Sequence, residues 1–230
     1  MDRIKQVEDY VRSTMTGAVA HDFKHVDRVR RWALRIAEEE GFEDLEIVEV
    51  AALLHDIGLP SVDEESERNK HGQVGAEIAA RFLKEKSVFT EEQIEHIALA
   101  IRHHCSQPAL VAELLKTIGE KGRLIAIIRD ADTMDAIGAV GLMRAFTSKA
   151  AKPEYDPENL KGDTWGLSGR EFDERFAKGL GIGDTIIDQV NFQISYYDNL
   201  NTKAAKRLAK PLVEFMKKYI IQLKREINNR

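Results

Sequence analysis

The chain has 230 residues, of which 43% are hydrophobic and 32% are charged, and its formal net charge is −5. This composition disfavours a disordered protein, and the negative charge disfavours nucleic acid or a membrane surface as a partner. Cys105 is the single cysteine, so no intramolecular disulfide can form, and the charged N-terminal segment has no apolar signal core, so we expect a cytoplasmic protein.

Apolar residues recur with a helical period through the first two thirds of the chain. In residues 26–41, the side chains of Val26, Val29 and Ala33 fall on one stripe, and Gly41 ends the run. Comparable stripes run through residues 45–56, 72–83, 90–104 and 122–137. Because no segment alternates with a period of two, the sequence predicts an all-α fold.

The second part of the chain combines a loop with further helices. Residues 148–172 gather glycines, prolines and other turn formers, which predicts a long surface loop. Helical patterning returns over residues 173–230, where Pro211 is expected to kink or split the last helix. We expect one helical domain over residues 1–230, with its core at about 20–147.

Helix-capping residues and one tryptophan add local expectations. Thr90 is expected to cap the helix that follows it, and Asn201 with Thr202 is expected to cap the last helix. Trp165 stands in the predicted loop, where it could serve as a lid, stack on a base or pack in the interior. The packing role is the favoured interpretation of this tryptophan.

Histidine and aspartate residues interrupt the apolar helices. "HDFKHVDRV" contains His25, "ALLHDIGLP" contains His55 and Asp56, and "LIAIIRDADTMDAIG" contains Asp130 and Asp132. An unpaired carboxylate on a buried helix face is strongly unfavourable, and a divalent cation removes that penalty. Imidazole with carboxylate suits Mn, Fe, Zn or Ni better than Ca. Helical periodicity does not choose between the two late aspartates, because both lie on partly apolar faces.

These residues carry a family resemblance. Their order resembles the H…HD…D signature of the HD-domain superfamily of metal-dependent phosphohydrolases, and "AALLHDIG" and "RDADTMDAIGAVGLMRAF" resemble family segments. The tail "YYDNLNTKAAKRLAKPLVEFMKKYI" resembles the C-terminal helices of small stand-alone bacterial members. The resemblance implies an HD-domain helical bundle with additional C-terminal helices. It also implies a divalent ion (Mn²⁺, Mg²⁺, Fe²⁺, Ni²⁺ or Zn²⁺) held by His25, His55, Asp56 and Asp132.

Three further histidines bear on the number of ions. His71, His103 and His104 resemble the additional ligands of binuclear members, and when protonated they could instead hydrogen-bond phosphate. The cyclic-dinucleotide phosphodiesterase branch carries a Gly-Tyr-Pro motif after its paired histidines. The segment "HHCSQPALVAELL" has no such motif, which disfavours that substrate class.

The implied reaction is hydrolysis of a phosphate ester or anhydride of a nucleotide or similar small phosphorylated compound by metal-activated water. Asp56 would be both ligand and water-orienting base, while Lys24 and Arg28 would bind phosphate. A cyclic-dinucleotide phosphodiesterase, a non-catalytic metal- or nucleotide-binding regulatory module and a di-iron oxygenase remain as alternatives. A non-catalytic relative would be expected to lose a ligand, and none is lost here. A homo-oligomer is left open.

Overall fold

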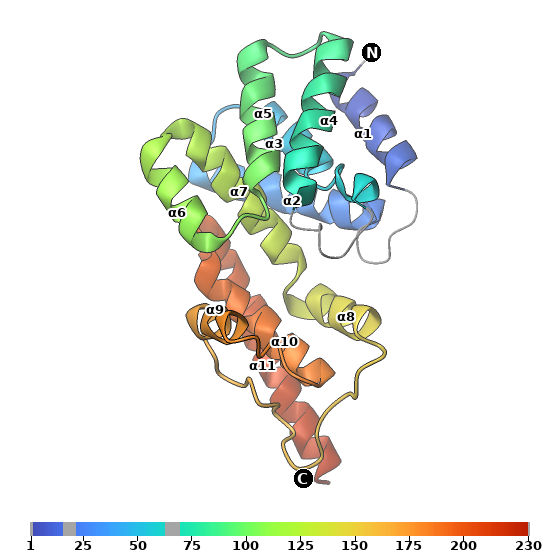
Figure 1. Cartoon of the computed structure of the whole chain (residues 1–230), viewed down its shortest axis with the longest axis vertical. Coiled ribbons are helices and arrows are strands. Elements are labelled where there is room, and N and C mark those ends of the chain that lie inside the picture. Colours follow the sequence, from blue (N-terminus) through green and yellow to red (C-terminus); the bar gives the residue numbers. More distant parts are fainter. Residues whose placement is uncertain (1, 16–21, 63–69, 230) are drawn as a thin grey trace. The chain divides into compact units, whose positions relative to one another are not determined.

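The computed structural model describes residues 2–15, 22–62 and 70–229, which are helical apart from loops and one isolated bridge between Asp156 and Asn159 (Figure 1). The predicted all-α fold is therefore confirmed. The backbone forms two compact units. Unit 1 contains the chain up to Asp132 together with Asn201–Ala204, and unit 2 contains Thr133–Leu200 together with the chain from Ala205 onward.

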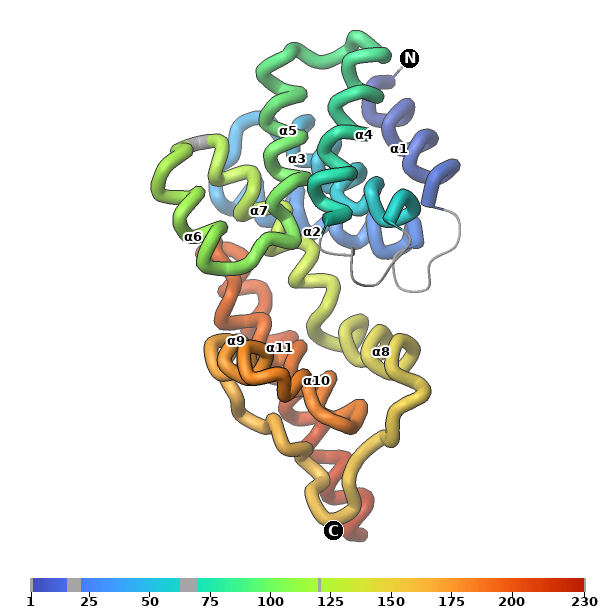
Figure 2. The backbone as a smooth tube through the Cα atoms, viewed as in Figure 1, coloured from blue at the N-terminus to red at the C-terminus, as the bar shows by residue number. Residues whose placement is uncertain are grey.

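Unit 1 is a bundle of helices around the buried helix α3. Its elements are α1 (Arg3–Thr14), α2 (Phe23–Glu40), α3 (Leu45–Leu54), the 3₁₀ turn η1 (Leu59–Ser61), α4 (His71–Lys86), α5 (Glu91–His103), α6 (Pro108–Thr117) and most of α7 (Glu120–Asp135). Helix α4 runs beside α5, and α2 packs on α3 (Figure 2). Seven of the ten residues of α3 are buried, so this helix has no solvated face and its C-terminal end lies inside the unit.

Unit 2 contains the helices that follow the core. They are α8 (Gly138–Ser148), α9 (Gly169–Ala177), α10 (Ile186–Ser195), the 3₁₀ turn η3 (Tyr196–Asn199) and nearly all of α11 (Lys203–Ile227). The predicted loop is present after α8, but it ends earlier than expected because α9 begins inside its range. The Ser168 side chain accepts from the backbone of Glu171, whose carboxylate accepts from the Ser168 backbone, and this capping box starts the helix.

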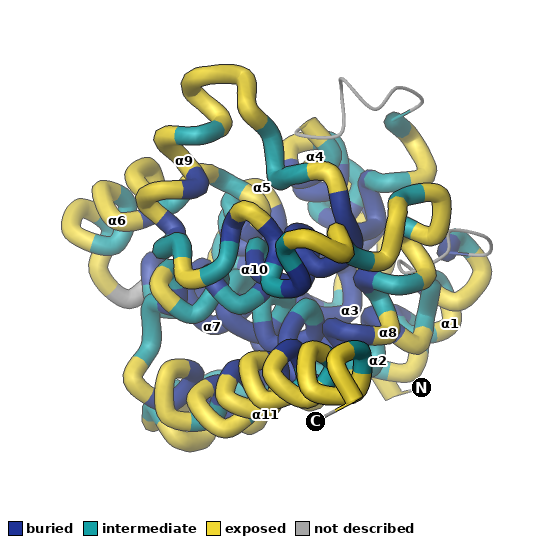
Figure 3. The backbone as a smooth tube through the Cα atoms, turned by 90° about the horizontal axis from the view of Figure 1, so that it is seen from below, coloured by how far each residue is buried: buried dark blue, intermediate teal, exposed yellow. Residues whose placement is uncertain are grey.

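One expectation about α5 is confirmed, and one about α11 is wrong. Thr90 caps α5 through a capping box with Gln93, as expected. The expected split at Pro211 is wrong, because α11 continues through that residue. Buried residues recur at helical spacing on both sides of it, including Ala205, Ala209, Val213, Met216 and Ile220. Figure 3 shows buried positions along one side of α11 and exposed positions along the other. This packing outweighs the one backbone hydrogen bond that proline removes.

Helix length and hydropathy also bear on membrane insertion. Across the part of the chain that the structure describes, no helix has both the length and the apolar character that crossing a bilayer requires.

Candidate metal centre

The local sequence places a histidine at the start of α2 and a histidine–aspartate pair at the end of α3. The side chain of Asp22 accepts from the backbone of Lys24 and His25, so α2 begins just before His25. His55 and Asp56 follow directly after the buried helix α3. The exposed fractions of His25, His55 and Asp56 are 0%, 0% and 3%, so all three side chains lie in the interior of unit 1.

Four side chains form a first group of converging ligand atoms: His25, His55, Asp56 and Asp132. The Nε2 atoms of His25 and His55 lie 3.2 Å apart, and Oδ2 of Asp56 lies 3.4 Å from each of them. Oδ1 of Asp132 lies 3.4 Å from Nε2 of His25 and 4.0 Å from Nε2 of His55. The side chain of Asp132 is 34% exposed, so the first group is accessible to solvent beside this residue.

A second group lies on the other oxygen of the same aspartate and contains His71, His104 and Cys105. Oδ1 of Asp56 lies 3.4 Å from Nε2 of His71 and 3.5 Å from Nε2 of His104. Those two nitrogens are 3.1 Å apart. The potential ligand atoms of His71, His104 and Cys105 all lie within 4.8 Å of one another. Asp56 therefore stands between the two groups and faces each with one oxygen.

Backbone carbonyl groups set the tautomers of two of these histidines. Nδ1 of His55 donates to the carbonyl oxygen of Ala52 at 2.8 Å, and Nδ1 of His104 donates to that of Ile101 at 2.7 Å. A carbonyl oxygen can only accept, so the proton of each neutral ring lies on Nδ1. The Nε2 lone pairs then point toward Asp56, as metal ligation by imidazole requires.

Opposite charges stabilise each other inside the first group. Burial lowers the pKa of His55, but the carboxylates of Asp56 and Asp132 outweigh burial and raise it. Burial raises the pKa of Asp132, but the positive charges of His25 and His55 outweigh burial and lower it. A proton on Nε2 of His55 therefore lies between side chains that could hold a metal ion.

The family model for the HD domain matches residues 22–137 of this chain, half of its length, and that range contains both groups. The chain belongs to the HD domain family.

Relatives of this HD domain protein extend the match beyond that range. It is 30% identical to the uncharacterized protein YpgQ of Bacillus subtilis (strain 168), over 99% of this chain and 95% of that protein. It resembles the crystal structure of Bacillus subtilis YpgQ in complex with ADP with a TM-score of 0.60 and 26% identity, over 97% of this chain and 94% of that one. An HD-superfamily hydrolase from Bacillus thuringiensis has the same fold, with a TM-score of 0.65 and 24% identity over 99% and 98% of the two chains.

Glycine residues allow the backbone segments of the HD domain to approach one another closely. A Cβ atom on Gly58 would lie 2.2 Å from the carbonyl oxygen of His71 and 2.5 Å from the nitrogen of Gly75. A Cβ atom on Gly72 would lie 2.8 Å from the carbonyl oxygen of Arg102. The first turn of α4 therefore packs directly on the turn after Asp56 and on the end of α5. This packing brings His71 into the second group.

The late aspartates Asp130 and Asp132 have different surroundings. Asp130 is fully buried, and its carboxylate accepts from the backbone nitrogen and the side-chain amide of Asn201. It also accepts from the backbone nitrogen and the hydroxyl of Thr202. Burial raises the pKa of Asp130, and these hydrogen bonds oppose that effect. Asp130 thus holds Asn201 and Thr202, the two residues directly before α11, and their expected role as the cap of that helix stays a prediction.

Three predicted residues lie outside the two groups or at their edge. His103 is half-buried with Nδ1 3.1 Å from the hydroxyl oxygen of Ser106, and burial, aided by the charge of Arg102, lowers its pKa. The exposed ammonium of Lys24 lies 3.5 Å from the carboxylate of Asp22. Arg28 is half-buried on α2, one turn after the first-group histidine.

Sequence reasoning missed a partly buried cation that supports the second group. The guanidinium of Arg129 donates to the carbonyl oxygens of His104, at 3.2 Å, and of Ser106. Burial lowers the pKa of Arg129. An arginine inside the apolar run "LIAIIRDAD" needs buried acceptors, and this was the available signal. Arg129 holds the turn from which His104 and Cys105 project.

Proposed function

We propose that this HD domain protein hydrolyses a phosphate ester or anhydride of a nucleotide, using divalent metal ions held by the first and second groups. The observation that carries the proposal is the position of Asp56, whose Oδ2 faces the first group and whose Oδ1 faces the second. A carboxylate shared between two sets of ligands is typical of two-metal hydrolytic sites.

The donor set fits borderline divalent transition metals. Buried imidazole nitrogens and carboxylate oxygens suit Mn, Fe, Zn or Ni, and the fixed tautomers of His55 and His104 support ligation through Nε2. In this proposal His25, His55, Asp56 and Asp132 hold one ion, and Asp56, His71 and His104 hold a second. His103 is omitted because its ring pairs with Ser106. The chemistry that such ions supply when bound is Lewis acidity, which polarises phosphoryl oxygens and generates hydroxide near neutral pH.

The chain's own residues would orient the reactants. The Asp56 carboxylate is proposed to accept a hydrogen bond from the attacking water, since it lies between the two groups and is almost fully buried. Arg28, one turn after His25 on α2, is proposed to bind phosphate oxygens, and the exposed Lys24 adds positive charge near the start of that helix. The accessible side of the first group, beside Asp132, is the proposed approach for the substrate.

The choice of a nucleotide draws support from a relative. Bacillus subtilis YpgQ, which is 30% identical over nearly the whole chain, was crystallised in complex with ADP. We therefore propose nucleoside phosphates as the first substrate class to test.

The test combines metal analysis of the purified protein with a phosphate-release screen over nucleoside mono-, di- and triphosphates, including assays coupled to an inorganic pyrophosphatase. The variant His55→Ala with Asp56→Ala should lose both bound metal and turnover. His103→Ala, which leaves the two groups intact, should keep both. Retention of metal and turnover by the double variant would refute the assignment of the site. A wild-type protein that binds metal and releases no phosphate from any of these nucleotides would refute the proposed reaction.

A further inference from the structure

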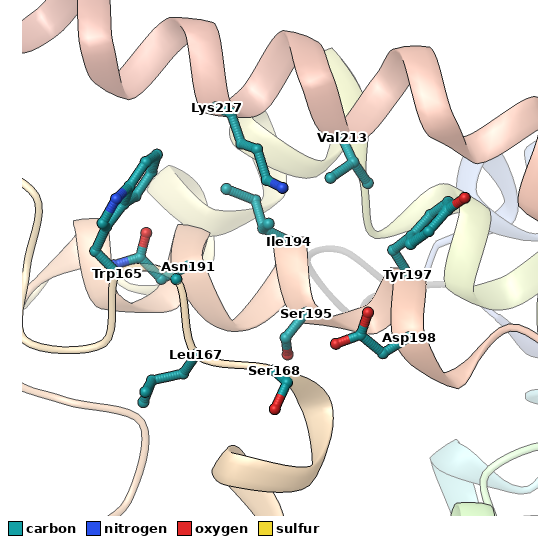
Figure 4. A pocket seen from close by; sticks show the side chains of 11 residues that line it. Trp165, Leu167, Ser168, Asn191, Ile194, Ser195, Tyr197, Asp198, Val213 and Lys217 are labelled. Atoms are coloured by element: carbon teal, nitrogen blue, oxygen red, sulfur yellow. The ribbon is translucent and has the colours of Figure 1, made fainter.

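Unit 2 contains a cavity of about 460 Å³ that the metal chemistry does not use (Figure 4). Trp165 and Leu167 of the long loop, Asn191 and Ile194 of α10, and Lys217 of α11 are among its lining residues. The volume falls in the range of small-molecule sites, which extends from about 300 to 1,000 Å³. In Figure 4 the ammonium of Lys217 points into the space that Trp165 and Asn191 border.

Asn191 lines this cavity, and its side chain carries a buried acceptor that no described residue satisfies. Its residue exposure is 3%, and its amide nitrogen donates to the carbonyl oxygen of Lys161 at 2.8 Å and to the hydroxyl oxygen of Thr164 at 3.4 Å. The Thr164 hydroxyl donates a hydrogen bond to Oδ1 of Asp188 at 2.7 Å, so toward the Asn191 amide it can only accept. The orientation of the amide is therefore fixed. Its Oδ1 accepts no hydrogen bond from any residue that the structure describes.

A ligand that donates a hydrogen bond to this acceptor would be stabilised by it. A buried carbonyl group without a hydrogen bond costs about 1–3 kcal/mol, and native proteins satisfy nearly all such groups. Because the amide nitrogen is already engaged, the site discriminates in favour of a ligand that donates an N–H or O–H to Oδ1.

The loop that carries the tryptophan is held firmly against α10. Oδ1 of Asp188 accepts from the backbone nitrogen of Thr164 at 3.2 Å, and Oδ2 accepts from the backbone and hydroxyl of Thr185 at 3.2 and 2.8 Å. Gly162 has a φ of +75°, and a Cβ atom there would lie 2.6 Å from Oδ1 of Asp188, so only glycine fits. The half-buried indole of Trp165 follows this anchored segment, which corrects the expectation of a buried packing residue.

Charge defines the two ends of the cavity. Lys161, outside the lining, places its ammonium 4.9 Å from the centroid of the Trp165 ring, and the exposed Lys217 extends into the cavity near Ile194 (Figure 4). Asp198 lies farther from the tryptophan, and its Oδ2 accepts from the backbone of Gly169 at 2.9 Å. An anionic group of a ligand is therefore favoured near the lysines and disfavoured near Asp198.

We propose that this cavity binds a nucleotide independently of metal ions. The base stacks on Trp165 and donates an N–H to Oδ1 of Asn191, and the phosphate pairs with Lys217. Stacking of a base on an aromatic side chain contributes about 1–3 kcal/mol and tolerates every base, because each has a flat face. The choice of a nucleotide among flat anionic N–H donors rests on the proposed function.

The experiment uses tryptophan fluorescence of the full chain in EDTA. The protein has two tryptophans, so Trp32→Phe leaves Trp165 as the only emitter. Titration with ADP and with adenosine should quench its emission saturably. Adding Asn191→Leu should lower the affinity for both ligands by about tenfold, the equivalent of about 1.4 kcal/mol. Adding Lys217→Ala should lower the affinity for ADP by a similar factor and leave the affinity for adenosine unchanged.

Lys218→Ala provides the matched control, because Lys218 is the exposed neighbour on α11 and does not line the cavity. It should leave both affinities unchanged. The proposal is overturned if neither ADP nor adenosine quenches the emission saturably. It is also overturned if Lys217→Ala and Lys218→Ala have the same affinity for ADP. Lys217→Ala changes an exposed residue, so the test stands even if Asn191→Leu fails to fold. Quenching in EDTA without phosphate release in metal would refute only the proposed hydrolysis, and the reverse result would refute only this cavity as a nucleotide site.

Discussion

The Nε2 atoms of His71 and His104 lie 3.1 Å apart although 33 residues separate them in the sequence. Nδ1 of His104 donates a hydrogen bond to a backbone carbonyl group, so Nε2 of the neutral ring carries a lone pair that faces His71. Two imidazole nitrogens at such a distance are stabilised by a shared proton or by a shared cation. The neighbouring His103, whose ring turns to Ser106, has no comparable position.

The pair His103 and His104 therefore gives a matched test of the second group. His104→Ala should remove one ion per chain and reduce phosphate release by more than about tenfold, because an imidazole ligand is lost. His103→Ala should leave the metal content and the rate near wild type. Metal content is measured by inductively coupled plasma mass spectrometry after gel filtration. Equal metal content in the two variants would show that His104 is not a ligand.

Asp130 and Asp132 should separate stability from metal binding. Asp130→Asn replaces an oxygen that accepts from Thr202 with an amide that cannot, so the free energy of unfolding should fall by about 2–3 kcal/mol, because a hydrogen bond to a charged group contributes about that much. Asp132→Asn should weaken metal binding by more than about tenfold, and in EDTA it should cost only the stability that the charge pairing of Asp132 with His25 and His55 provides. Urea unfolding and metal titration measure the two effects. The assignment fails if Asp130→Asn is the variant that loses metal.

The pKa of His55 predicts opposite pH dependences for stability and for metal binding. Its pKa is raised in the folded chain, so protonated His55 contributes stability that is fully present below the unfolded value of about 6.5. That contribution is lost as the pH rises through the folded pKa. Metal binding must displace the same proton, so metal affinity should rise over this range.

The measurement is urea unfolding in EDTA and metal titration at several pH values between about 6 and 8. His55→Gln, which cannot titrate, serves as the reference, and the prediction concerns the difference between the two proteins. A wild-type protein whose stability in EDTA rises with pH relative to His55→Gln would contradict the raised pKa.

Gly58 should be intolerant of any side chain. Gly58→Ala places a Cβ atom 2.2 Å from the carbonyl oxygen of His71, so the first turn of α4 must move. We expect a loss of about 1–3 kcal/mol in stability, as for an overpacked core, together with loss of the second ion. Gly41→Ala is the control, because Gly41 has a φ of +67° with nothing within 4 Å. It should cost about 1–2 kcal/mol through backbone strain and keep both ions. Equal metal contents in the two variants would exclude this positioning role.

Much of the fold followed from local sequence signals. The helical period of the apolar residues predicted the all-α class, and Thr90 marked the start of α5 because a cap depends only on residues within one turn. The expectation for Pro211 was wrong because a local rule competed with long-range packing. The buried stripe of α11 crosses the proline, and no single window of sequence contains the residues that cover that stripe.

The site was less accessible to sequence reasoning, which relied on the family resemblance for its ligand set. Helical periodicity could not separate Asp130 from Asp132, since the residues that satisfy Asp130 begin 71 positions later. His103 and His104 could not be separated either, because adjacent positions at a helix end differ in direction by about 100° and the end of α5 was not known to one residue. The ligand set stays a prediction for the metal analysis to test.

The hydrogen bonds from His55 and His104 to carbonyl groups three residues earlier have a consequence for assembly. Each ring is oriented by the helix that carries it, so the donor atoms occupy their places before any ion arrives. The chain differs in this respect from zinc fingers, which fold only around their metal. Chelation should remove the ions from the first and second groups without altering the circular dichroism spectrum. The metal-free protein should then bind one divalent ion after another, in repeated cycles, without refolding.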